Sequence, residues 1–227
     1  MNNFFAAPTN EWGDNALKLT PAGIAAVAVV IIVLIAITLI VRQKEHHSKK
    51  ITTKQLVFSA VALALAMVTS MIKLFNLPMG GSITLLSMLF VVLIGYWYGP
   101  YAGIITAVAY GLLQFVMEPI FYTIPQMITD YPLAFGALGF SGFFYKKKNG
   151  LIKGYIAGVL GRYFFAFLSG LIFFASYAKG SGMSAPVYSL AYNGSYLLTE
   201  AAITLVVISL PPVTKALSHI KTIALEK

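Results

Sequence analysis

The chain has 227 residues, of which 59% are apolar and only 10% charged, and its mean hydropathy of +0.82 excludes an ordinary soluble protein. Its net charge of +9 fits the lysine and arginine excess of cytoplasmic loops in membrane proteins, so we do not expect nucleic acid as a partner. The absence of cysteine excludes disulfides and thiolate chemistry, and the whole composition predicts an all-α polytopic membrane protein in a lipid bilayer.

The first 54 residues combine a polar tail, an apolar run and a basic segment. Residues 1–20 lack the basic start of a secretory signal peptide and are predicted to form an extracellular tail. Ala22 to Val41 is a run of twenty residues without a charge. At 1.5 Å per residue this run matches a hydrocarbon core of about 30 Å, so residues 21–42 are predicted as an extra transmembrane helix. Residues 43–54 are rich in lysine and are predicted as a cytoplasmic linker.

Six further apolar runs are predicted to form a membrane domain over residues 55–212. Their expected bounds are 55–75, 83–97, 101–117, 125–145, 151–178 and 186–210. Proline and glycine punctuate the connections between them, as in the segment 76–82 and at Pro211-Pro212. Residues 213–227 are predicted as a cytoplasmic tail.

The distribution of basic residues favours one orientation for these seven predicted spans. With the N-terminus outside, the segments 42–54 and 146–153 and the C-terminus all lie inside, where lysine and arginine accumulate. The loops 76–82, 118–124 and 179–185 then meet on the outer face. This topology satisfies every basic cluster of the chain.

Asp130 is the only aspartate within a predicted span. A lone acid in an apolar span is costly and is usually retained for a substrate, an ion or a counter-charge. Gln126 lies one helical turn before it on the same face. Asp130 is therefore predicted to contact a cationic or donor-rich ligand, and the alternative is an internal salt bridge to Arg162.

Three further polar residues in predicted spans are candidate ligand contacts or structural pairs. Arg162 and Glu200 are each near the middle of consecutive antiparallel spans, so an Arg–Glu pair is favoured over ligand contact. Asn193 needs a hydrogen-bond partner wherever it lies. It is five residues from Tyr188, about 140° away on a regular helix, so either the helix is irregular there or a ligand touches two of its sides.

Two interleaved patterns of small residues occur in the second predicted span. Ala60 and Ala64 form one pair, and Ala62 and Ala66 form the other. Small residues four apart let another helix approach closely. That helix can belong to this chain or to a partner membrane subunit.

Several classes of chemistry are unsupported by any motif. The chain has no GxxxxGK[ST] loop for ATP and no HExxH motif, and His46-His47 is expected to be solvated among basic residues, so neither a cofactor nor a metal is expected. No serine–histidine arrangement supports a nucleophilic mechanism. The sequence therefore predicts a binding protein and not an enzyme.

Four motifs in order along the chain resemble a known family. They are Leu77-Pro78-Met79-Gly80-Gly81-Ser82, then Gln126 with Asp130-Tyr131, then Arg162-Tyr163 with Gly170 and Phe174, and finally Tyr188-Ser189-Leu190 with Asn193-Gly194. Together they resemble the thiamine-specific substrate-binding subunits of energy-coupling factor (ECF) vitamin transporters, over about residues 53–212.

The resemblance implies a function, a location and a set of partners. The protein would be a six-helix S component, with the extra first helix outside the family pattern. It would capture thiamine near the outer face of a bacterial plasma membrane. It would work with a coupling membrane subunit, met by the alanine patterns at residues 60–66, and with two ATPase subunits that use ATP.

The resemblance also assigns site residues. Asp130 corresponds to the acidic ligand of the family, with Tyr131 beside it and Gln126 and Arg162 nearby, and Tyr188 and Asn193 correspond to polar contacts. Ala166 occupies the position of a usual histidine contact, and Phe174 that of a stacking tryptophan in some members.

Three other functions stay open at this point. The same architecture could bind a thiamine-related heterocycle, such as a pyrimidine or thiazole precursor. An ion-coupled small-molecule carrier would use Asp130 and Glu200. A purely structural membrane subunit would bind no small ligand.

Overall fold

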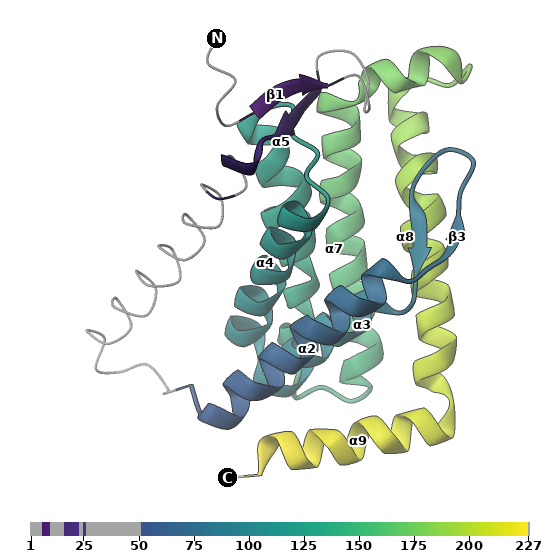
Figure 1. Cartoon of the computed structure of the whole chain (residues 1–227). Coiled ribbons are helices and arrows are strands. Elements are labelled where there is room, and N and C mark those ends of the chain that lie inside the picture. Colours follow the sequence, from purple (N-terminus) through teal and green to yellow (C-terminus); the bar gives the residue numbers. More distant parts are fainter. Residues whose placement is uncertain (1–5, 10–15, 23–24, 26–50, 227) are drawn as a thin grey trace.

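The computed structural model describes residues 6–9, 16–22, 25 and 51–226. Over this part of the chain, helices run side by side as a bundle, and one helix, α9 (Pro211–Leu225), lies across one end of it (Figure 1). The predicted extra helix Ala22–Val41 lies outside the described residues except at residues 22 and 25. Most of the predicted linker 43–54 lies outside them too.

Four described helices are long and apolar enough to cross a membrane. They are α2 (Thr53–Met71), α4 (Pro100–Met117), α7 (Gly150–Phe173) and α8 (Ala185–Ser209). A fifth apolar helix, α3 (Ser87–Tyr98), is shorter. These helices confirm the prediction of a mostly helical membrane protein, whereas the count of seven spans and the orientation stay predictions.

Two short antiparallel ribbons depart from the all-α prediction. One joins β1 (Ala6–Thr9) and β2 (Ala16–Leu19), and the other joins β3 (Lys73–Asn76) and β4 (Ser82–Thr84). The predicted span 55–75 therefore ends too late, and the span 83–97 begins too early. The cause is the turn at residues 77–81, whose glycines fold the chain back so that Lys73 pairs with Thr84.

The predicted span 125–145 is helical but changes its winding along its length. It consists of α5 (Ile124–Ile128), a π-helical turn η1 (Thr129–Leu133), α6 (Ala134–Gly136) and a 3₁₀ segment η2 (Ala137–Phe144). Pro132 lies in the π-helical turn, and proline has no backbone N–H for the regular α-helical bond. Such turns occur often at functional sites.

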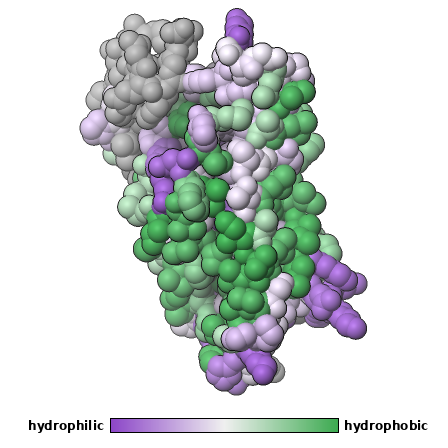
Figure 2. All heavy atoms as spheres, turned by 90° about the vertical axis from the view of Figure 1, so that its right-hand side faces the viewer, coloured by the Kyte–Doolittle hydropathy of each residue, from purple (hydrophilic) through white to green (hydrophobic). Residues whose placement is uncertain are grey.

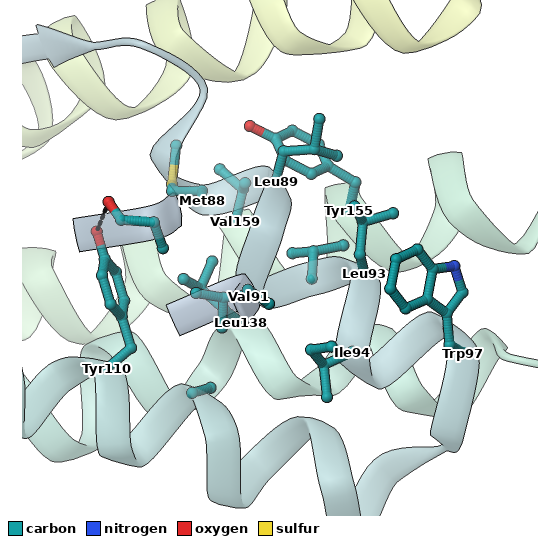
Figure 3. Packing of buried hydrophobic residues seen from close by; sticks show 14 of the residues in the cluster. Met88, Leu89, Val91, Leu93, Ile94, Trp97, Tyr110, Leu138, Tyr155 and Val159 are labelled. Carbon is teal, nitrogen blue, oxygen red and sulfur yellow. Dashed lines mark hydrogen bonds between the residues drawn. The ribbon is translucent and has the colours of Figure 1, made fainter. Parts of the chain in front are cut away.

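The core is built around α3. Its residues Met88, Val91 and Ile94 are fully buried, and they pack among side chains of α2, α4, η2 and α7 (Figure 3). Tyr110 of α4 crosses this region and donates its hydroxyl to the carbonyl of Ala66 at 3.3 Å. Among the five apolar helices named above, the shortest one, α3, is thus the most buried.

The face that carries α8 is mostly apolar. Figure 2 shows a broad band of hydrophobic residues on this side, with hydrophilic residues mainly toward the two ends. Helix α8 itself carries exposed apolar side chains, namely Val187, Leu190, Leu198 and Val206. A surface of this kind suits the hydrocarbon region of a bilayer.

Candidate ligand-binding site

Asp130 lies in the π-helical turn η1 and is held by a glutamine one turn before it. The Gln126 side chain is fully buried, and its Nε2 donates to Asp130 Oδ2 and to the carbonyl of Ile120 at 3.2 Å. Its Oε1 accepts from the backbone N–H of Tyr122 at 2.9 Å. Gln126 therefore fixes both the Asp130 carboxylate and the loop before α5.

Tyr131 secures the same loop from its other side. Its hydroxyl donates to the carbonyl of Glu118 at 2.7 Å and accepts from the N–H of Ile120 at 2.9 Å. Its ring packs edge-on against Phe115 at 4.9 Å between centroids. The structure thus gives Tyr131 a supporting position, with its hydroxyl occupied by backbone partners.

A serine missed by the sequence reasoning lies beside Asp130. Ser169 of α7 is 1% exposed, and its hydroxyl lies within reach of the Asp130 carboxylate. A buried hydroxyl beside a carboxylate can donate to it, and hydrogen bonds to a charged group are the stronger ones. The one signal in the sequence is a polar residue within an otherwise apolar run.

Asn193 lies at the contact between α7 and α8. Its Nδ2 donates to the carbonyls of Ala166 at 3.2 Å and Ser189 at 3.0 Å, and its Oδ1 accepts from the Tyr196 hydroxyl at 2.9 Å. The helices approach closely here because Gly170 has no side chain; a Cβ there would lie 2.2 Å from Ser189 Oγ. Asn193 is only 5% exposed and is occupied by these partners.

Three tyrosines form a row along α8, one helical turn apart. The rings of Tyr188 and Tyr192 stack at 6.1 Å with an interplanar angle of 15°, and those of Tyr192 and Tyr196 meet at 5.7 Å. Because α8 is a regular helix throughout, Tyr188 and Asn193 lie on different sides of it, and the alternative of an irregular helix is wrong.

The turn of the β3–β4 hairpin packs on this tyrosine row. Gly80 and Gly81 have φ angles of +93° and +77°, which favour glycine. A Cβ at Gly80 would lie 3.2 Å from the Tyr192 ring, and one at Gly81 would lie 2.7 Å from the Tyr196 ring. The Leu77–Ser82 motif therefore covers one side of the site.

An aromatic cluster lies at the C-terminal end of α7. Phe174 contacts Tyr122 edge-on at 5.2 Å, and the hydroxyls of Tyr122 and Tyr177 are 2.9 Å apart. Burial and this hydrogen bond raise the pKa of Tyr122 above its ordinary value. The sequence reasoning included Phe174 and missed Tyr122, which lies in the loop that Gln126 holds.

The favoured ion pair between Arg162 and Glu200 is wrong. The Arg162 guanidinium lies 4.0 Å from the ring centroid of Phe135, and among the described residues the one ion pair joins Lys73 and Glu118 at 3.1 Å. The alternative salt bridge from Arg162 to Asp130 is therefore also absent from this part of the chain. Arg162 is instead placed over an aromatic face, a favourable position for a cation.

Glu200 binds the start of α3. Its carboxylate accepts from the N–H and hydroxyl of Thr84 at 3.1 and 2.7 Å, from the Ser87 hydroxyl at 3.3 Å and from the Met88 N–H at 3.4 Å. An acid at a helix N-terminus is stabilised by the free N–H groups and the helix dipole. These donors replace the predicted arginine, and they leave Glu200 without the free oxygen that an ion-coupled carrier would need.

The comparison with known families shows to which family the chain belongs. The sequence model of the family described as thiamine transporter protein matches residues 56–220. The chain belongs to this family. The match confirms the resemblance carried by the four ordered motifs, and the family is one of multi-pass membrane transporters of thiamine and not of enzymes.

Individual relatives agree with the family match. The chain is 33% identical over 168 residues to the thiamine transporter ThiT of Bacillus subtilis, covering 68% of this chain and 85% of that protein. It is 34% identical over 96 residues to ThiT of Lacticaseibacillus paracasei, covering 37% and 47% respectively. The solved structure of ThiT from Listeria monocytogenes matches with a TM-score of 0.53 and 26% identity, over 70% of this chain and 93% of that one.

The two alanine patterns of α2 face in different directions. Ala62 and Ala66 are buried in the core, at 6% and 0% exposure, whereas Ala60 and Ala64 are exposed. The first pair therefore serves packing within the chain. The second pair lies on the outer side of α2, where it is open to a partner.

Proposed function

We propose that this member of the family captures thiamine in the region between η1, α7 and α8, with Asp130 as the anionic contact. The observation that carries the proposal is a buried carboxylate held by Gln126 in η1, which packs on α7, while the tyrosine row lies on α8, the next helix packed on α7. Thiamine joins a donor-rich aminopyrimidine to a permanently cationic thiazolium ring. A carboxylate and aromatic faces are the groups that recognise such a molecule.

The other site residues receive distinct roles in this proposal. Tyr188 and Phe174 supply aromatic surface for the two rings of thiamine. Arg162, which lies over the Phe135 ring, forms a boundary of the site. Asn193 and the backbone of Ala166 shape the wall formed by α7 and α8. Tyr131 and Gln126 act by positioning Asp130 and the loop before α5.

The proposal extends to assembly and orientation. We infer that the chain is the substrate-binding subunit of an ATP-driven ECF importer, with a coupling membrane subunit and two ATPase subunits as partners. The exposed pair Ala60 and Ala64 on α2 lets a partner helix approach closely, and its exposed neighbours Val57, Val61 and Val68 supply apolar contact. In the predicted seven-span topology, the site opens to the outer face and α9 lies inside.

Calorimetric titration of the purified protein in detergent tests the ligand. Wild type is expected to bind thiamine, and Asp130→Asn should weaken binding about ten- to hundredfold, because a hydrogen bond to a charged group contributes about 1.5–3 kcal/mol. Glu118→Gln is the matched control, because its side chain is 70% exposed and paired only with Lys73. Equal affinity in Asp130→Asn and wild type would refute the assignment of Asp130.

A second candidate ligand follows from one residue. Ala166 presents only a methyl group where the family usually has a histidine contact, so a thiamine-related pyrimidine or thiazole is the alternative substrate. If thiamine is the ligand, Ala166→His should gain up to about tenfold in affinity from one added hydrogen bond. Competition by the separate pyrimidine and thiazole fragments, with no binding of thiamine itself, would favour the alternative.

A further inference from the structure

The C-terminal helix α9 is anchored across the end of the bundle opposite the proposed site (Figure 1). The Tyr98 hydroxyl donates to the carbonyl of Ala224 at 3.0 Å. Lys221 Nζ donates to the carbonyl of Tyr145 at 3.3 Å and lies 3.7 Å from the centroid of the Tyr96 ring. Contacts to α3 and to the end of η2 thus hold α9 in place as part of the fold.

The helix has an apolar strip that the bundle leaves uncovered. Ala224 is buried against the bundle at 3% exposure, whereas Ile220 and Ile223 are 37% and 39% exposed. At 100° per residue, Ser218 and Thr222 lie about 160° from Ile220, on the opposite side of the helix. The helix therefore carries an exposed apolar strip at Ile220 and Ile223, and a second side with Ser218 and Thr222 that also bears the exposed Leu225.

Positive charge gathers at this end of the molecule. Lys215 of α9 is exposed, and so are the three lysines of the adjacent loop, Lys146, Lys147 and Lys148. Of the acidic residues in the described part of the chain, only Glu226 lies here, and its backbone carbonyl accepts from Lys54 at 3.1 Å. This end of the molecule, which carries the apolar strip, is therefore basic.

We propose that α9 lies in the membrane surface and binds anionic phospholipids. Ile220 and Ile223 insert at the boundary of the acyl chains, and Lys215 and the lysines of the loop 146–148 bind the headgroup phosphates. An amphipathic helix with apolar and basic sides binds membranes in this manner, and each lysine near an anionic surface contributes attraction.

The absence of cysteine allows a direct test on the full chain. Single spin labels at Ile220→Cys, Ile223→Cys and Ser218→Cys are compared in nanodiscs of phosphatidylcholine alone and with phosphatidylglycerol added. We expect the ratio of oxygen to nickel-chelate accessibility to be severalfold higher at positions 220 and 223 than at 218, and to rise further with phosphatidylglycerol. Combined Lys146, Lys147, Lys148 and Lys215 to Gln substitutions should abolish that rise.

Two results would overturn the proposal. If the labels at 220 and 223 are as accessible to the nickel chelate as the label at 218, the strip faces water or a protein partner. A depth that does not respond to phosphatidylglycerol would remove the role of anionic lipid. Thiamine titration of the same variants keeps the two proposals separate, because these substitutions lie at the opposite end of the bundle from Asp130.

Discussion

Glu200 offers the sharpest test of how this fold is held together. Its buried carboxylate, 4% exposed, receives donors from Thr84, Ser87 and Met88, and so ties α8 to the start of α3 and to the end of the β3–β4 hairpin. Glu200→Gln keeps the shape of the side chain. It replaces one acceptor oxygen by a donor group that faces other donors, and it removes the negative charge from the helix N-terminus.

The magnitude follows from these contacts. Bonds to a charged acceptor contribute about 1.5–3 kcal/mol each against about 0.5–1.5 kcal/mol for neutral ones, and the helix-terminus charge adds about 0.3–2 kcal/mol. The two hydroxyl donors can rotate and accept from the new amide, so we expect a net loss of about 2–4 kcal/mol. For a domain of this size, that loss lowers the melting temperature by about 5–15 °C.

The assay is thermal unfolding in detergent, followed by tryptophan fluorescence, to which Trp97 contributes from the buried core. Glu118→Gln is the control, because a surface ion pair contributes only about 0–1 kcal/mol. If Glu200→Gln melts at the same temperature as Glu118→Gln, the contacts at the start of α3 do not stabilise the fold, and the reasoning is refuted.

Two further predictions concern the site cover and the surface of α2. Gly81→Ala should lower both the melting temperature and the thiamine affinity, because the new Cβ would meet Tyr196 at 2.7 Å. Gly182→Ala is the control. Gly182 has a φ of +72° and open space around it, so this substitution adds only backbone strain of about 1–2 kcal/mol. If Gly81→Ala and Gly182→Ala change the thiamine affinity equally, the hairpin does not cover the site. Ala66→Leu should destabilise the protein by about 1–3 kcal/mol by overpacking. Ala64→Leu should leave the melting temperature unchanged and reduce co-purification with the coupling subunit; normal assembly would exclude this surface as the partner contact.

The class of the protein and its family follow from the sequence alone. Long apolar runs predict membrane helices because the bilayer requires about twenty apolar residues per span. Four of the six runs in the region 55–212 form helices that meet this requirement. The ordered motifs around Asp130 and Asn193 indicated the thiamine transporter family, which the family match confirms. These features depend on local composition and on spacing along the chain.

The partners of the polar residues were decided only by tertiary structure. Hydropathy places Arg162 and Glu200 at one depth and leaves their rotation about each helix axis undetermined. In the structure Arg162 lies over Phe135, and Glu200 turns to the donors at the start of α3. The same limit applied to α2, where spacing could not tell which alanine pair faces inward.

Local sequence also gave no warning of the irregular backbone that shapes the site. Leu74 and Phe75 continue the apolar pattern of α2, yet they lie in strand β3, where Phe75 pairs with Ile83 and Leu74 lies at an irregularity of the register. Apolarity and length determined what kind of protein this chain is. The direction of each polar side chain depended on which donors and rings the folded chain brought within reach.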